Sequence, residues 1–126
     1  MSDFSLGDRE LDVMGVLWDE GSGTVSEVRE RLADELAYTT VLTILRNLEA
    51  KGLLRHEEEG KAHRYFPRVA RQAARRGAID RLVGKLFQGS TEQLLAHLVE
   101  ERKIGPEELQ RLTTKLAARK RKGGGA

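Results

Sequence analysis

Five polar side chains between residues 39 and 47 point outward from a predicted helix once its apolar residues are buried. A lysine in the last turn of the same helix adds a sixth polar group. Threonine hydroxyls can form hydrogen bonds with phosphates and bases, arginine can pair with guanine, and asparagine can pair with adenine. The pattern is typical of a helix that reads a DNA groove, although Thr39 or Thr40 could instead serve only as the helix N-cap. The six predicted DNA contacts are Thr39, Thr40, Thr43, Arg46, Asn47 and Lys51.

A second cationic group, formed by Lys61, His63 and Arg64, suits phosphate contacts, which position a protein on DNA without reading its sequence. Residues 61–76 carry six basic side chains and no acidic one. The net charge is −7 in residues 1–35 and +9 in residues 36–126, although the whole chain carries only +2. This division predicts an anion-binding surface in the second part. The alternative for the basic run is a helix face that only contacts solvent.

Catalytic and metal-binding chemistry has few candidates here. The chain has no cysteine and only three histidines, His56, His63 and His97. His56 and His63 could pair across a hairpin, but two ligands without carboxylates arranged around them make a weak metal site. No phosphate-binding loop, HExxH sequence or nucleophile signature occurs. We therefore expect no enzyme activity, no cofactor and no metal.

Three short helices are predicted to position the first polar group, at residues 8–19, 24–36 and about 39–51. Thr24 and Glu27 form a capping box at the start of the second helix, and Gly52 ends the third. The apolar residues recur at helical spacing, which predicts a compact bundle. The expected buried positions are Leu11, Met14, Leu17, Trp18, Val25, Val28, Leu32, Val41, Leu45 and Leu48.

A β-hairpin is predicted from residue 53 to residue 67, where Pro67 ends the second strand. With Glu59 and Gly60 as the loop, Glu58 faces Lys61 and His56 faces His63, although the register could shift by one residue. Three helices followed by a hairpin form a winged helix-turn-helix, in which the third helix enters the major groove and the hairpin is the wing. The fold class is therefore mainly α with a small β-wing.

Helices are predicted again beyond the hairpin, from residue 69 to about residue 118. Their apolar stripes lack a partner within their own segment, so we expect them to form a homodimer. Packing back onto the N-terminal bundle is the alternative. The expected dimerisation residues are Ile79, Leu82, Val83, Leu86, Phe87, Leu94, Leu95, Leu98, Leu109, Leu112 and Leu116.

The domain organisation follows from these elements. We expect a DNA-binding domain at residues 1–67, a dimerisation region at 68–118 and a basic flexible tail at 119–126. No apolar run exceeds three residues in a chain of 126, so a membrane-spanning helix is not expected. Together with the absence of cysteine, this predicts a cytoplasmic protein.

Several motifs in this order resemble the penicillinase repressor family, which includes methicillin-resistance and copper-responsive repressors. The matching segments are LGDRELDVM (6–14), LW (17–18), TVSEV (24–28), YTTVLTIL (38–45), KGLL (51–54) and GKAHRYFP (60–67). The resemblance covers about residues 6–116 and implies a homodimeric winged-helix repressor of inverted-repeat operators. It also implies DNA contacts from Thr39, Thr40 and Thr43.

The chain departs from this family at informative positions. Asn47 and Lys61 stand where many relatives carry arginine, which bears on base preference and on phosphate binding. In the antibiotic-resistance branch a protease cuts an asparagine–phenylalanine bond, but His97 and Leu98 occupy that place here. This argues against proteolytic induction and leaves an upstream sensor protease as an open partner. Copper sensing through the family's cysteine motif is excluded because the chain has no cysteine.

The sequence therefore predicts a repressor that occludes a promoter as a homodimer bound to double-stranded DNA. The alternative from another class is a winged-helix module that binds a protein and no DNA. A repressor with a small-molecule pocket at its dimer interface is a third possibility that the sequence does not decide. The regulated genes, the operator and the inducing signal stay open.

Overall fold

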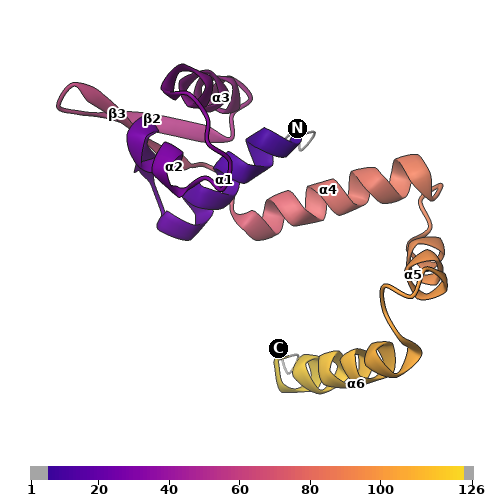
Figure 1. Cartoon of the computed structure of the whole chain (residues 1–126). Helices are drawn as coiled ribbons and strands as arrows, with labels where there is room; N and C mark the ends of the chain where they lie inside the picture. The colour runs from indigo at the N-terminus through magenta and orange to yellow at the C-terminus, as the bar shows by residue number, and fades with distance from the viewer. Residues whose placement is uncertain (1–5, 124–126) are drawn as a thin grey trace. The chain divides into compact units, whose positions relative to one another are not determined.

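A computed structural model describes residues 6–123, which form six helices and three strands (Figure 1). The elements divide between two compact units, Met1–Asp80 and Arg81–Ala126. The division falls inside a helix rather than at residue 67, where the sequence analysis ended the first domain. In chain order, the elements are α1 (Asp8–Glu20), β1 (Gly23–Thr24), α2 (Val25–Arg31), α3 (Tyr38–Ala50), β2 (Leu54–Glu59), β3 (Ala62–Pro67), α4 (Arg71–Leu86), α5 (Thr91–Glu100) and α6 (Pro106–Gly123).

The three predicted N-terminal helices are present, and local caps define their ends. The backbone amide of Gly7 donates to the Glu10 carboxylate at the start of α1, over 3.0 Å. At the start of α2, the Thr24 hydroxyl accepts from the amide of Glu27 at 3.2 Å, as the predicted capping box requires. Gly52, with φ +83°, follows α3 in the left-handed conformation that a residue without a Cβ adopts readily.

The second helix is shorter than predicted, because α2 ends at Arg31 rather than near residue 36. Leu32 is its C-cap and has extended backbone angles, φ −71° and ψ 140°. Leu32 and Leu36 still pack partly against the core from the connection that follows. Their apolar spacing therefore reflects core contacts made by a loop and not a continued helix.

The sheet has the strand order β1-β3-β2, and both pairings are antiparallel. The predicted hairpin exists, but its loop lies one residue later than expected, so each β2 residue pairs two residues further along β3. Glu59 pairs with Ala62, Glu58 faces His63 and His56 faces Tyr65, so the two loop residues are Gly60 and Lys61. Gly60 has φ +62° at the first loop position, where a type II′ turn requires glycine.

The core of the N-terminal unit consists of residues from all three helices and the hairpin. Leu11 was expected in this core, yet it is 46% exposed, and Val13 is buried in its place. Ile44 is also buried and was not predicted, whereas Trp18 is partly covered and donates from Nε1 to the Val69 carbonyl at 2.9 Å. The buried cluster comprises Val13, Met14, Leu17, Val25, Val28, Val41, Ile44, Leu45, Leu48, Leu53, Leu54 and Tyr65.

The C-terminal unit contains the end of α4 together with α5 and α6. The Ser90 hydroxyl caps α5 by accepting from the amide of Gln93 at 3.1 Å, and Pro106 is the first residue of α6. The helix α6 continues through residues 119–123 of the predicted tail, to Gly123. Lysine and arginine are good helix formers and are favoured near a helix C-terminus. Residues 124–126 of that tail lie outside the described residues.

Within the described part of the chain, none of the helices is both long and apolar enough to cross a membrane.

The core assignment can be tested with two leucine-to-alanine substitutions. Leu45 is fully buried, so Leu45→Ala should lower the free energy of unfolding by about 2–5 kcal/mol, because it removes apolar contacts and leaves a cavity. Leu11→Ala is the matched control and should cost less than about 1 kcal/mol, because Leu11 is exposed. Urea denaturation followed by circular dichroism measures both values. Equal losses in the two variants would contradict this core.

Candidate nucleic-acid interface

The helix α3 presents its polar face to solvent because its opposite face is buried in the core. Val41, Ile44, Leu45 and Leu48 form the buried face. The N-cap of α3 is Ala37, which supplies no side-chain hydrogen bond. Neither threonine at the start of the helix is therefore a cap, and the alternative role of Thr39 or Thr40 does not apply. The exposed residues of the predicted contact set are Thr39, Thr40, Thr43, Arg46 and Asn47.

These exposed side chains differ in how far they are already engaged. The Thr43 hydroxyl donates to the Thr39 carbonyl at 2.9 Å, so its oxygen and methyl group remain to face a ligand. The side chains of Arg46 and Asn47 form no hydrogen bond or ion pair with any described residue. Arg46 does exert an electrostatic effect on Tyr65, whose pKa is raised chiefly by burial. Two side chains suited to hydrogen bonding with base edges are thus both uncommitted and exposed.

Lys51 is engaged within the protein. Its Nζ donates to Glu10 Oε1 at 2.9 Å and to Oε2 at 3.0 Å. The Glu10 side chain is only 17% exposed, so this ion pair is partly shielded from water. The contact joins the end of α3 to the first turn of α1. Lys51 therefore holds the orientation of α3 instead of presenting an unengaged ammonium group to DNA.

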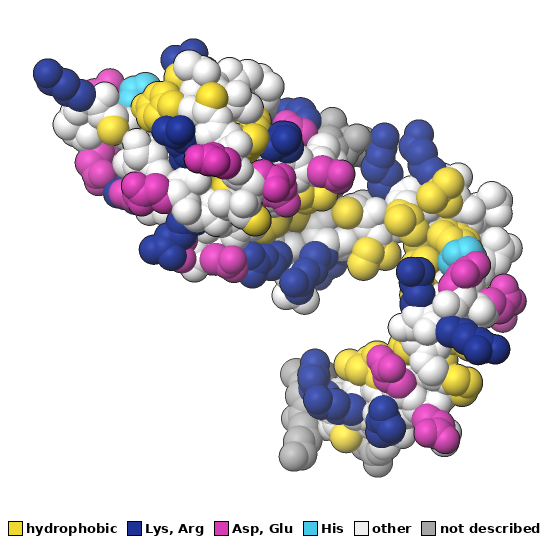
Figure 2. Space-filling model, viewed as in Figure 1, with side chains coloured by type: hydrophobic (Ala, Val, Ile, Leu, Met, Phe, Trp, Pro, Cys, Tyr) yellow, Lys and Arg dark blue, Asp and Glu magenta, His cyan; other side chains and the backbone are white. Residues whose placement is uncertain are grey.

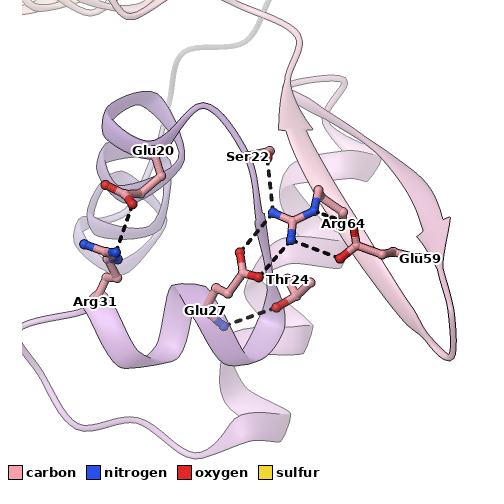
Figure 3. A network of polar contacts seen from close by, with 7 residues as sticks. All are labelled: Glu20, Ser22, Thr24, Glu27, Arg31, Glu59 and Arg64. Atoms are coloured by element: carbon pink, nitrogen blue, oxygen red, sulfur yellow. Dashed lines mark hydrogen bonds and ion pairs between the residues drawn. The ribbon is translucent and has the colours of Figure 1, made fainter.

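Arg64 is also engaged, and Figure 3 shows its guanidinium between Ser22, Glu27 and Glu59. Nε donates to Glu59 Oε1 at 3.0 Å, and Nη2 donates to Glu59 Oε2 at 3.0 Å. Glu27 accepts from Nη1 at 2.9 Å and from Nη2 at 2.8 Å, and the Ser22 hydroxyl accepts from Nη1 at 3.2 Å. We call these four residues the Arg64 clamp.

The electrostatics of the Arg64 clamp follow from its geometry. Hydrogen bonds from Arg64 hold the pKa of the Glu27 and Glu59 carboxyls below their ordinary range, and the Glu59 and Glu27 carboxylates in turn raise the pKa of Arg64. All three groups are therefore charged at neutral pH. One cation lies between two anions, so the clamp does not present a net positive charge to a phosphate.

The wing retains two of its three predicted phosphate-binding groups in open positions. Lys61 lies in the hairpin loop and His63 lies beside it on β3, and both side chains are exposed. Neither forms a hydrogen bond or ion pair within the described residues, and the His63 ring stacks on His56 with centroids 4.3 Å apart. His56 Nδ1 is 2.6 Å from Glu49 Oε2, which connects the wing to α3.

Among residues 6–123, no group of three or more histidine and carboxylate side chains is arranged to hold a metal ion.

The basic run after the wing is not a continuous free surface. Arg71 Nη2 donates to Asp19 Oδ1 at 2.7 Å and to the Gly15 carbonyl at 3.2 Å. The visible face in Figure 2 shows acidic side chains interspersed with basic ones over the N-terminal unit. The excess of basic residues after residue 35 therefore overstates the cationic surface available to a ligand.

Sequence reasoning missed the acidic partners of these cations. In the sequence, the capping box accounts for Glu27 and the hairpin loop accounts for Glu59, while Glu10 appears only within the family motif. Glu27 is 37 residues from Arg64, and Glu10 is 41 residues from Lys51. The alternation of side chains along β3 was the one signal available, because it places Arg64 on the opposite face from the buried Tyr65.

Comparison with known proteins supports a common origin for this arrangement. Residues 6–118 match the family described as penicillinase repressor. Transcriptional regulator BlaI of Mycobacterium tuberculosis is 38% identical over 116 residues, which cover 89% of this chain and 83% of that protein. The penicillinase repressor of Bacillus licheniformis is 26% identical over 109 residues, which cover 85% of each chain.

A solved structure agrees with the N-terminal fold. The solution structure of the DNA-binding domain of the repressor BlaI has a TM-score of 0.50 and 32% sequence identity, and the match covers 56% of this chain and 90% of that domain. The segment of this chain that forms three helices, a short first strand and a hairpin wing therefore resembles that domain in both structure and sequence. The chain belongs to the penicillinase repressor family of winged-helix transcriptional regulators.

Proposed function

We propose that this chain, a DNA-binding transcriptional repressor by its family, acts as a homodimer on an inverted-repeat operator in the cytoplasm. Each subunit inserts α3 into a major groove and rests its wing on the adjacent phosphates. A dimer binds two half-sites about one or more helical turns (~34 Å) apart on one face of the duplex. The bound dimer excludes polymerase, so repression requires no chemical reaction.

The observation that carries the proposal is the uncommitted polar face of α3. Arg46 and Asn47 are exposed one turn beyond Thr43, on a helix whose other side is fixed in the core. We assign base reading to Arg46 and Asn47, and both base and phosphate contacts to Thr39, Thr40 and Thr43. Lys61 and His63 contact phosphates from the wing. Lys51 and Arg64 are left out of this set because carboxylates already bind them.

Dimerisation is supported by the apolar side chains that the C-terminal helices leave in solvent. The helix α5 buries none of its residues, and Leu86, at the end of α4, is 67% exposed. Figure 2 shows hydrophobic side chains at the surface of this unit. Val83 is already buried, and Phe87, Leu94, Leu98 and Leu109 are half-buried. The proposed contacts with a second copy come chiefly from Ile79, Leu82, Leu86, Leu95, Leu112 and Leu116, which are all exposed.

Base reading and phosphate binding can be separated by two substitutions. Asn47→Ala should change the preferred base at one position of each half-site, because it removes a side chain that forms two hydrogen bonds with adenine. Lys61→Ala should weaken binding to all sequences alike and reduce the log–log salt slope of the dimer by about 2, one phosphate per subunit. Selection from random duplexes gives the first result, and fluorescence anisotropy at several salt concentrations gives the second.

The same selection tests the alternative function. If the wild-type protein recovers no duplex at ~0.15 M salt, where electrostatic attraction is screened beyond about 8 Å, the protein-interaction module is favoured. If Asn47→Ala and Lys61→Ala both weaken every sequence equally, the division between α3 and the wing is wrong.

Dimerisation through α6 can be tested with a matched pair of variants. Leu112→Glu with Leu116→Glu places two charges on the exposed apolar stripe, so sedimentation should show a shift from dimer to monomer. Gln110→Glu with Thr114→Glu adds the same charge to the same helix away from that stripe and should leave the dimer intact. A dimer that persists in the leucine variant would show that the interface lies elsewhere.

A further inference from the structure

We propose that Arg64 is a positioning residue, which holds the wing against the start of α2 and thereby aligns Lys61 with DNA. This inference rests on the DNA binding proposed above and assigns to Arg64 a role other than the phosphate contact expected from the sequence. The contacts of the Arg64 clamp, the placement of its carboxylates and the exposure of the hairpin loop together support it.

The first argument is the saturation of the guanidinium group. An arginine side chain has five N–H donors. Arg64 uses all five, because Nε forms one hydrogen bond while Nη1 and Nη2 form two each, at distances between 2.8 and 3.2 Å. A phosphate oxygen could therefore bind Arg64 only by displacing a carboxylate or the Ser22 hydroxyl. Two anions already lie beside the guanidinium, so that exchange is electrostatically unfavourable.

The second argument is that the acceptors come from different parts of the fold. Ser22 precedes β1, Glu27 lies in the first turn of α2, and Glu59 is the last residue of β2 before the hairpin loop. Arg64 itself is on β3, where it pairs with Thr24 of β1 and Glu57 of β2. A single side chain thus joins the loop end of the wing to the helix-turn-helix.

The third argument concerns what else could fix the wing. At its base the hairpin is anchored by Leu54 and Tyr65, which are both buried. Residues 57–62 near the loop are all exposed. β1 pairs with β3 at only two positions, Tyr65 and Arg64. The contact of His56 with Glu49 joins the middle of the wing to α3, whereas the Arg64 clamp reaches Glu59, the last β2 residue before the loop. The clamp therefore restrains the loop end, beyond the reach of the β1 pairing.

The carboxylates of the Arg64 clamp are about half exposed, at 49% for Glu27 and 56% for Glu59. Ion pairs in such positions are screened by water and contribute little to global stability. Loss of the clamp should therefore leave the thermal midpoint close to that of the wild type. The effect should appear in DNA affinity, through the orientation of Lys61.

The primary test compares Arg64→Lys with Arg55→Lys on the duplex selected by the wild-type protein. Lysine keeps the charge that a phosphate requires, but it has three donors and cannot bridge two carboxylates and a hydroxyl as arginine does. We expect Arg64→Lys to weaken binding about tenfold, the scale set by loss of a charge-assisted contact. Arg55 lies on β2 over the Phe66 ring, 4.3 Å from its centroid, and Arg55→Lys should bind as the wild type does.

A double-mutant cycle between Arg64→Met and Lys61→Met tests whether Arg64 acts through Lys61. If it does, the double variant binds no more weakly than Arg64→Met alone, and its salt slope falls by about 2 per dimer. If Arg64 contacts phosphate directly, the two losses add and the slope falls by about 4 per dimer. Thermal unfolding of each variant checks that the fold is retained.

Each outcome decides the inference. Additive losses in the cycle, or wild-type affinity in Arg64→Lys, overturn the positioning role while leaving the proposed repressor intact. If Lys61→Met itself has no effect, Lys61 makes no DNA contact for Arg64 to align, and the positioning role is overturned. Failure of the wild-type protein to bind any duplex would instead overturn the proposed function.

Discussion

The Arg64 guanidinium group constrains the arrangement of this winged helix, because its five N–H donors all bind residues from other segments of the fold. Arg64 satisfies its five N–H groups with Ser22, Glu27 and Glu59, so three chain segments must stay at fixed distances from β3. Lys51 and Glu10 impose a similar constraint at the end of α3, where they join it to α1. The core sets which face of α3 is buried, the ion pair of Lys51 joins α3 to α1, and the Arg64 clamp joins the hairpin to α2. The exposed face of α3 is presented as a consequence.

The helices could be predicted from the sequence because their apolar spacing and caps are local. Val41, Leu45 and Leu48 are buried as the spacing indicated, and Thr24 caps α2. The hairpin register could not be predicted in the same way. Glycine suits more than one position of a two-residue loop, and both registers place Leu54 and Tyr65 on the same face of the hairpin, so the alternation of side chains does not separate them. Leu54 would face Tyr65 in the expected register and faces Pro67 in the observed one, so the burial of Leu54 and Tyr65 is compatible with both.

The candidate site was harder to predict than the fold, because a sequence does not distinguish an exposed, unpaired arginine from one that is bound by carboxylates. Arg46 and Arg64 have the same side chain, yet only Arg64 has carboxylates within reach. The deciding residue, Glu27, lies 37 positions away and already had a sufficient local explanation as a helix-capping residue. The capping role of Glu27 explains its presence in the sequence and gives no indication that it also binds Arg64. Only the folded chain separates the exposed Arg46 from Arg64, which is bound by two carboxylates.

Ion pairs between residues far apart in the sequence also account for part of the uneven distribution of charge along the chain. The acidic partners of Lys51, Arg64 and Arg71 include Glu10, Glu27 and Asp19, which all belong to the first 35 residues. Much of the contrast between the two halves is therefore neutralised within the fold. A surface with fewer free cations makes fewer phosphate contacts, so non-specific attraction to DNA is reduced. Under the proposed function, discrimination between sequences then depends more strongly on Arg46 and Asn47, because hydrogen bonds from these side chains require matching base edges.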